Sequence, residues 1–162
     1  MKEYPLSEQK NRRQKMDSKY DMLKLENQLC FPLYLCSKET IRLYKRFLDP
    51  LDLTYTQYIA MMVMWEHKSL TVKEMGKILL LDSGTLTPVL KKLESKGYLS
   101  RKRSKDDERT VMISITERGE KLKAEAAMIP KRMGDCIKLS QEEASKLKEI
   151  LDKTLKNIER GK

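Results

Sequence analysis

Residues 71–97 decide the fold, and they read TVKEMGKILLLDSGTLTPVLKKLESKG. Thr71 and Glu74 have the spacing of a capping box, in which each side chain caps the backbone of the other, so a helix is expected to begin there. Apolar residues follow at helical spacing, break off at 81–84 and resume as far as Gly97, a typical helix stop. The stretch therefore predicts two short helices joined by a tight turn.

A basic hairpin is expected directly after these helices. Residues 98–103 and 110–116 alternate as strands do, with an apolar residue at every second position from Val111 to Ile115, and the charged turn 104–108 joins them. Helix, turn, helix and hairpin in this order indicate a winged helix-turn-helix. In that fold the second helix fits the major groove of DNA and the hairpin lies beside it.

The charge of the chain favours a polyanionic partner. Its 162 residues include 34 Lys and Arg against 24 Asp and Glu, which gives a formal net charge of +10. Between residues 91 and 109, eight basic residues stand against four acidic ones. The expected second helix and hairpin thus hold a local excess of positive charge, as a DNA-binding surface requires.

The cysteine and histidine content indicates the cell compartment and whether a metal site is expected. No apolar run is long enough for a membrane span, and the first residues lack the apolar core of a signal peptide. The three cysteines, an odd number, favour a reducing cytoplasm over a secreted disulfide scaffold. With one histidine and no cysteine pair at ligand spacing, neither a metal nor another cofactor is expected.

Four segments are expected along the chain. Residues 1–18 are polar and predicted to be disordered, with a DNA-contacting arm as the alternative. Residues 19–52 supply a long amphipathic N-terminal helix over 23–48, residues 53–119 the winged helix-turn-helix, and residues 120–162 further amphipathic helices. Because the winged module can cover its own core, the apolar stripes at both ends predict a homodimer built on these helices. The expected fold class is mainly α, an α+β winged helix with long terminal dimerisation helices.

Local signals set several helix boundaries. Further capping boxes start at Thr54 and Ser140, and a helix break is expected near Pro130 and Gly134. Pro32, inside the first amphipathic stretch, should either begin the regular helix or kink it.

These segments together resemble the MarR family of winged-helix regulators, and within it the organic-hydroperoxide-sensing, OhrR-like branch. The resemblance extends from about residue 23 to the C-terminus. The resemblance to the broad family lies in residues 81–88 (LDSGTLTP) and 101–119. The resemblance to the branch lies in residues 24–31 (KLENQLCF) and 53–58 (LTYTQY). The resemblance implies a dimeric transcriptional repressor, not an enzyme, that releases double-stranded palindromic operator DNA when an organic hydroperoxide oxidises it.

The resemblance makes Cys30 the oxidised residue, although on composition alone a buried, inert cysteine is the expectation. Tyr34 lies one helical turn on and can reach Cys30 within one helix. Tyr44 lies fourteen residues on, about 21 Å along the axis, so it could reach Cys30 only from a partner chain whose helix runs antiparallel. By resemblance, Tyr34 and Tyr44 hydrogen-bond the thiolate and Tyr55 is a third residue of the sensor pocket. Such donors stabilise the reactive thiolate, whose first oxidation product is a sulfenic acid.

The other two cysteines decide the fate of that sulfenic acid. Cys36 is six residues from Cys30, about 9 Å along a helix, too far for a disulfide, and is interpreted as a buried structural residue. Cys136, expected after the helix break, matches by position the resolving cysteine of two-cysteine members of the branch, which implies an intersubunit disulfide. A structural Cys136 stays open, in which case a small thiol would cap Cys30.

DNA contacts are expected from a recognition helix over residues 83–96 and from the hairpin. Base edges should be met by early helix residues, and phosphates by later lysines and by basic residues of the hairpin. The base-edge candidates are Ser83, Thr85, Thr87 and Pro88; the phosphate candidates are Lys91, Lys92, Lys102, Arg103 and Lys105. By resemblance, Arg109 enters the minor groove, and Asp107 can orient its guanidinium group. The alternative is a solvated charged hairpin without a DNA role.

Three other functions remain open at this point. In the first, a small aromatic effector releases the DNA and oxidation of Cys30 is incidental. In the second, the chain is a thiol peroxidase, against which stand the winged module and the lack of the cysteine loop of those enzymes. In the third, it is an architectural DNA-binding protein without a switch.

Overall fold

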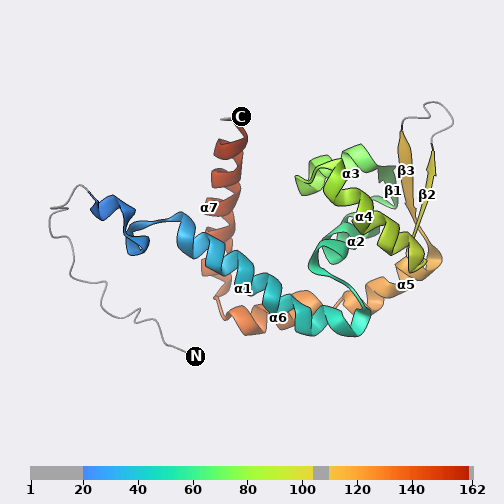
Figure 1. Ribbon diagram of the computed structural model, residues 1–162. Helices are drawn as coiled ribbons and strands as arrows, with labels where there is room; N and C mark the ends of the chain where they lie inside the picture. Colours follow the sequence, from blue (N-terminus) through green and yellow to red (C-terminus); the bar gives the residue numbers. More distant parts are fainter. Residues whose placement is uncertain (1–19, 104–109, 161–162) are drawn as a thin grey trace. The chain divides into compact units, whose positions relative to one another are not determined.

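The computed structural model describes residues 20–103 and 110–160. The chain forms two units, Met1–Thr40 and Ile41–Lys162. The described part of the first unit has two short 3-10 helices, η2 (Asp21–Leu23) and η3 (Leu25–Asn27), and the start of α1 (Cys30–Leu48), which continues into the second unit. The second unit then contains η4 (Asp49–Leu51), α2 (Tyr55–His67), β1 (Ser69–Thr71), α3 (Val72–Leu79), α4 (Ser83–Ser95), β2 (Leu99–Arg103), β3 (Val111–Ile115), α5 (Glu117–Ala126), α6 (Ile129–Ile137) and α7 (Gln141–Arg160) (Figure 1).

The first amphipathic helix begins later than the sequence predicted. It was expected over residues 23–48, but α1 starts at Cys30, so that Pro32 falls in its first turn. A proline is tolerated there because the first backbone N–H groups of a helix have no intrahelical acceptor. The preceding 3-10 turns are closed by side chains, since the Asn27 amide donates to the Asp21 carbonyl at 2.7 Å and Gln28 donates to the Met22 carbonyl.

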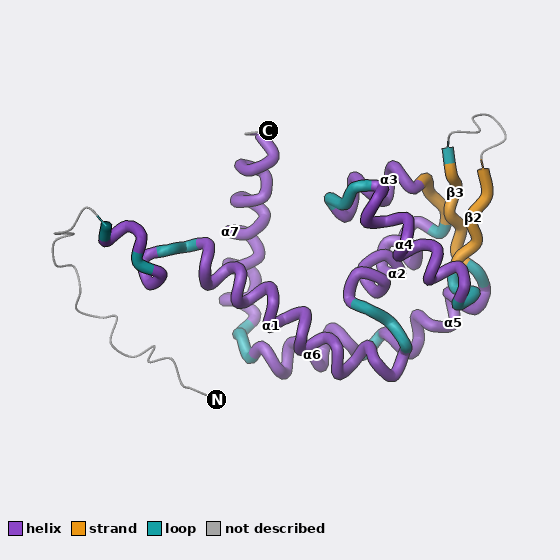
Figure 2. Tube along the Cα trace, viewed as in Figure 1, coloured by secondary structure: helices purple, strands orange, loops and turns teal. Residues whose placement is uncertain are grey.

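The predicted winged helix-turn-helix is confirmed. Its three strands form an antiparallel sheet in the order β1-β3-β2, in which Ile113 of β3 pairs with Leu70 on one side and Arg101 on the other (Figure 2). Strand β1 was not predicted, because three residues are too few to show an alternating pattern. The sheet joins the end of α2 to the hairpin and so fixes the hairpin beside α4.

The core of the second unit lies under these elements and is apolar. Helix α2 supplies the centre of this core through its continuous apolar run, and the inner faces of α3, α4 and the sheet cover it. Its largest fully buried side chains are Leu48, Met61, Met64, Met75, Leu86, Leu90, Leu93 and Ile113. Most of these side chains come from α2, α3, α4 and the sheet, so the winged module has an apolar core of its own.

The C-terminal helices differ from the sequence expectation in one respect. The break lies at Ala127–Met128, before α6, and not between Pro130 and Gly134. Pro130 occupies the first turn of α6, where its missing N–H costs nothing, and the helix continues through Gly134. Helix α7 begins with the predicted capping box, Ser140 and Glu143, and buries none of its own residues.

No helix in the described part of the chain is both long enough and apolar enough to cross a membrane. Residues 1–18, the predicted disordered extension, lie outside the described residues.

Candidate DNA-binding surface and thiol sensor

The N-terminus of α4 is fixed by a cap that the sequence pattern had not indicated. Asp82 accepts the Thr85 backbone N–H at 2.8 Å through Oδ1 and the Thr85 hydroxyl at 2.9 Å through Oδ2. These hydrogen bonds hold the pKa of Asp82 below its ordinary value of 3.8. An aspartate three residues before a threonine, directly after a helix break, is the signal that could have revealed the cap.

The residues expected to meet base edges lie on the first turns of α4. Ser83, Thr85 and Pro88 are exposed, and Thr87 is half-buried. The Thr87 hydroxyl donates to the Ser83 carbonyl at 2.6 Å, and the Thr85 hydroxyl donates to Asp82. Both hydroxyl protons are therefore engaged within the helix, which leaves the oxygens free to accept hydrogen bonds from base amino groups.

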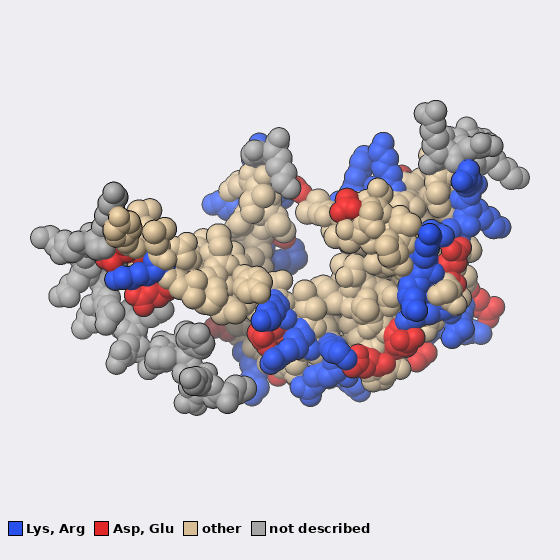
Figure 3. Space-filling view, viewed as in Figure 1, with Lys and Arg blue, Asp and Glu red and all other residues tan. Residues whose placement is uncertain are grey.

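Exposed basic side chains continue this surface. Lys91 and Lys92 on α4, and Lys102 and Arg103 at the outer end of β2, are all exposed. In the face shown in Figure 3, Lys and Arg side chains gather over α4 and the outer part of β2. The remaining expected hairpin residues, Lys105, Asp107 and Arg109, lie outside the described residues.

Two other basic residues of the same stretch point into the fold. The Lys96 Nζ lies 2.9 Å from Asp52 Oδ2, and only 14% of the Lys96 side chain is exposed. Arg101 donates through Nε to Glu94 Oε2 at 2.8 Å and through its backbone N–H to Glu94 Oε1 at 3.1 Å. The Arg101–Glu94 pair ties β2 to α4, so both basic residues serve the geometry of the module.

Two of the three tyrosines expected in the sensor pocket, Tyr44 and Tyr55, form part of an aromatic cluster in the second unit. The rings of Tyr44 on α1 and Tyr55 on α2 have centroids 4.8 Å apart. Tyr58, which was not among the predicted residues, is buried, and its ring centroid lies 5.8 Å from that of Tyr44. Its spacing of three residues from Tyr55, on one face of a helix, could have indicated it.

Burial raises the pKa of two phenols in this cluster. It raises the pKa of Tyr44 above its ordinary value of 10.0, with Tyr55 adding to the effect. Burial raises the pKa of Tyr58 as well, and Tyr44 and Tyr55 reinforce the shift. Around neutral pH, Tyr44 and Tyr58 are therefore neutral O–H groups that can donate a hydrogen bond to an anion.

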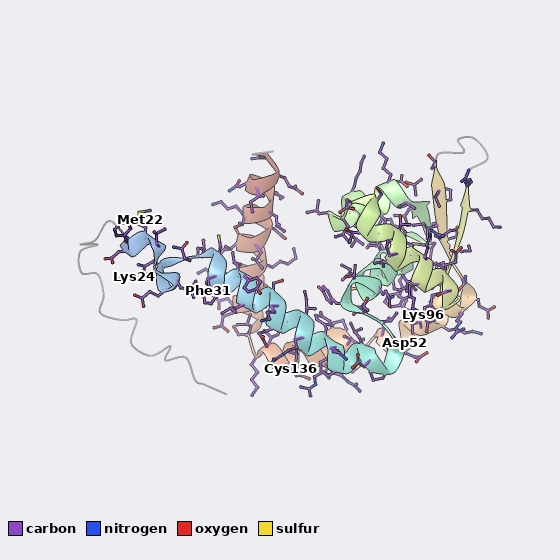
Figure 4. The ribbon with its side chains drawn as sticks, in the orientation of Figure 1. Met22, Lys24, Phe31, Asp52, Lys96 and Cys136 are labelled. Atoms are coloured by element: carbon purple, nitrogen blue, oxygen red, sulfur yellow. The ribbon has the colours of Figure 1, made fainter. Side chains whose placement is uncertain are left out.

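The three cysteines carry free thiols at distinct positions. Cys30 is exposed, not buried, as the first residue of α1, and Tyr34, 60% exposed, follows one turn later. Cys36 is also exposed in the single chain, so its expected burial is wrong for the chain taken alone. Cys136 is half-buried within α6 (Figure 4), whereas the sequence pattern had placed it after a helix break. In the described part of the chain, no His, Cys, Asp or Glu residues gather in a group able to hold a metal ion.

Known proteins share this architecture over almost the whole chain. The family described as transcriptional regulator SarA/Rot matches residues 42–126. The organic hydroperoxide resistance transcriptional regulator of Bacillus subtilis (strain 168) is 50% identical over 143 residues, which are 88% of this chain and 97% of that protein. The structure of reduced AbfR bound to DNA has a TM-score of 0.73 and 33% identity, covering 87% of this chain and 99% of that one. The structure of disulfide-formed AbfR has a TM-score of 0.62 and 34% identity, covering 86% and 96%; AbfR is a protein of Staphylococcus epidermidis.

Proposed function

Because the chain belongs to the MarR family of winged-helix DNA-binding transcriptional regulators, in its organic hydroperoxide (OhrR-like) branch, we propose that it is a homodimeric, cytoplasmic repressor that releases operator DNA when Cys30 is oxidised. The observation that carries this proposal is the exposure of the Cys30 thiol at the start of α1, in a chain whose second unit holds a tyrosine cluster in which burial raises the pKa of Tyr44. An exposed thiol is open to a peroxide, and phenolic donors suit the thiolate that reacts.

DNA recognition is assigned to α4 and the hairpin. The exposed side chains of Ser83, Thr85 and Pro88 meet base edges in the major groove, together with Thr87, and Lys91 and Lys92 meet phosphates. Lys102, Arg103 and Lys105 bind phosphates beside the groove, and Arg109, oriented by Asp107, enters the minor groove. Two copies of α4 about one helical turn of DNA apart would read a palindrome. Reduced AbfR, which shares this fold, has been solved bound to DNA, and this supports DNA as the partner.

Dimerisation is assigned to the terminal helices, because in the described part of the chain each of them carries large apolar side chains that are exposed. In the first unit Leu29 is 77% exposed and Leu33 is 39% exposed. In the second unit α7 exposes a row of apolar residues, namely Leu147, Ile150, Leu151, Leu155 and Ile158. Apolar surface on this scale marks an interface, and the simplest partner is a second copy of the chain.

The dimer would also complete the sensor. Tyr34 reaches Cys30 from its own helix, and the partner's Tyr44, with Tyr55 behind it, reaches Cys30 if the two α1 helices run antiparallel. The thiolate attacks one peroxide oxygen, so that an S–O bond forms and the O–O bond breaks. The leaving alkoxide takes a proton and departs as the alcohol, which leaves a sulfenic acid on Cys30.

A second thiol then traps this product. The thiol of Cys136 in the partner subunit displaces water from the sulfenic acid and forms a disulfide, as the disulfide form of AbfR makes reasonable for this family. If Cys136 does not act, a small cellular thiol performs the same displacement. Either product lies on α1 and changes the packing of the helices that carry the winged modules.

The test compares operator binding before and after treatment with one equivalent of cumene hydroperoxide per Cys30. The operator would be a duplex selected from random sequences by the reduced protein. Wild type is expected to lose about tenfold or more in affinity, which is within the range of allosteric coupling. Cys30→Ser should keep its affinity, and Cys36→Ser, the matched control on the same helix, should behave as wild type. Release of DNA by Cys30→Ser under peroxide would overturn the proposal.

Non-reducing electrophoresis with mass mapping identifies the second thiol. A covalent dimer that contains Cys30 and Cys136 and is lost in Cys136→Ser would support the two-cysteine route. A mixed disulfide formed only when a small thiol is added would support capping instead. Titration of the reduced protein with phenolic compounds tests the aromatic-effector alternative, which predicts release without oxidation. Repeated turnover of excess peroxide would favour the thiol peroxidase.

A further inference from the structure

Trp65 links two parts of the second unit that lie far apart in sequence. It is the only tryptophan of the chain and stands near the end of α2, with 8% of its surface exposed. Its indole Nε1 donates a buried hydrogen bond to the Gly119 carbonyl at 2.8 Å. Gly119 follows the hairpin and lies in the first turn of α5.

The backbone at Gly119 lies where both expected DNA-reading elements end. The Thr116 hydroxyl, just after β3, donates to the carbonyl of Gly97, just after α4, at 2.6 Å, and also accepts the Gly119 N–H at 3.1 Å. A Cβ atom at Gly119 would collide with the Tyr98 carbonyl oxygen, so the two backbones are packed without space between them. A shift at Gly119 must therefore displace the ends of both α4 and β3.

On its other side, Trp65 contacts the tyrosine cluster. Its ring meets Tyr58 edge-on with centroids 6.2 Å apart, and Tyr58 in turn contacts Tyr44, which contacts Tyr55. Rigid aromatic rings in a close-packed interior cannot absorb a displacement by compression. A change in the position of Tyr44 is thus passed from ring to ring towards Gly119.

We propose that Trp65 is a positioning residue that couples the tyrosine cluster to the base of the winged module. The inference rests on the proposed function, in which oxidation of Cys30 removes the anion to which the partner's Tyr44 donates. Tyr44 then repacks against Tyr55 and Tyr58, Trp65 follows, and the hydrogen bond to Gly119 pulls on the ends of α4 and β3. Both DNA-reading elements are displaced, because the Thr116 hydroxyl joins the Gly119 N–H to the carbonyl of Gly97.

The variant Trp65→Phe tests this coupling, because it keeps an aromatic ring and removes the N–H donor. Operator affinity is measured for reduced and oxidised protein, and the fraction of oxidised Cys30 is determined by alkylation and mass spectrometry in the same samples. We expect the reduced variant to bind within about threefold of wild type and the oxidation-induced loss of affinity to shrink about tenfold, since coupling and affinity are separate quantities. Ser69→Ala is the matched control: it removes the hydrogen bond to the Ile113 carbonyl within the sheet, away from the ring series, and should respond as wild type.

Two results would overturn the inference. One is release of DNA by Trp65→Phe as complete as that of wild type at equal Cys30 oxidation. The other is an equal loss of affinity in the reduced and oxidised states, which indicates a structural role only. Failure of oxidised wild type to release DNA would instead overturn the proposed function, and this inference with it.

Tryptophan fluorescence of the wild-type protein is an independent test, and it can be carried out even if Trp65→Phe fails to fold. As the only tryptophan, Trp65 reports its own surroundings. Its emission is expected to change in step with DNA release during a peroxide titration, and the change should be absent in Cys30→Ser. Emission that stays constant while wild type releases DNA would contradict the proposed coupling.

Discussion

Lys96, at the C-terminal end of α4, is anchored to Asp52, in the segment that leads from α1 to α2. The Lys96 Nζ lies 2.9 Å from Asp52 Oδ2 and also donates to the Asp52 backbone carbonyl (Figure 4). A third acceptor, Gln57 Oε1, lies 3.5 Å away, and Gln57 is the buried member of the capping box that begins α2. One ammonium group thus fixes the end of the expected recognition helix to the start of the core helix.

Removal of this ammonium group is expected to destabilise the fold. Lys96→Met keeps the apolar stem but removes a largely buried ammonium group and its hydrogen bonds to Asp52, which should lower the free energy of unfolding by about 1–3 kcal/mol, since hydrogen bonds of charged groups are the stronger ones. Lys45→Met is the matched control, because Lys45 pairs with Asp49 at 2.6 Å but is 72% exposed. It should cost about 0–1 kcal/mol. Urea denaturation of both variants makes the comparison, and equal losses would show that Lys96 is an ordinary surface residue.

The exposed lysines of α4 are expected to act on DNA binding instead of on stability. A plot of log affinity against log salt concentration has a negative slope, and its magnitude should fall by about one in each of the variants Lys91→Ala, Lys92→Ala and Arg103→Ala. Each variant removes one phosphate contact. Affinity would be measured by fluorescence anisotropy with one operator duplex at several salt concentrations. Lys121→Ala on α5, where the side chain is 75% exposed, is the control and should leave the slope unchanged. Lys96→Met should leave it unchanged too; unaltered slopes in all variants would exclude α4 and the outer end of β2 from the DNA interface.

The contrast between these lysines shows what could be predicted from the sequence. The capping boxes at Thr54, Thr71 and Ser140 were predicted because their hydrogen bonds join residues three apart, and all three are confirmed. The inward direction of Lys96 was not predicted, since its partner Asp52 lies 44 residues earlier. The same holds for the Trp65–Gly119 hydrogen bond, across 54 residues. Hydrogen bonds between residues close in sequence can be predicted from their spacing, whereas a hydrogen bond to a residue far away in the sequence cannot.

The tyrosine cluster was predicted only in part, for a related reason. Tyr44 and Tyr55 lie together because α1 and α2 pack on one core, and the resemblance had indicated both residues. Tyr58 was missed, although it belongs to the same cluster, because a buried tyrosine in an apolar helix looks like ordinary core. The predicted meeting of Cys30 with Tyr44 requires a partner chain, so it stays a prediction.

Acid is expected to loosen the start of α4 through Asp82. The pKa of this carboxyl is lower in the folded chain than its ordinary value of 3.8, chiefly because it accepts the Thr85 backbone N–H. A lowered pKa means that the stabilisation is present above the unfolded value and is lost as the pH falls through the folded value. Asp82→Asn retains a capping side chain without a titratable group, so its stability should fall less than that of wild type between about pH 5 and pH 3. Urea unfolding midpoints at each pH make the measurement, and parallel pH profiles would contradict the assignment.

The proposed antiparallel arrangement of two α1 helices makes a specific prediction about Ser37. If Cys30 faces the partner's Tyr44, the two-fold axis passes at the residue halfway between them, which is Ser37, and Ser37 lies seven residues on from Cys30, on nearly the same face of α1. Leu33 and Ile41, 39% and 44% exposed, are equally spaced about this point and would face each other across the axis. Ser37→Cys, in a chain whose three native cysteines are replaced by serine, should therefore form a covalent dimer rapidly under mild oxidation. Glu39→Cys in the same background is the control, because it lies on the opposite face of the helix and should cross-link slowly; equal rates for the two variants would exclude this register.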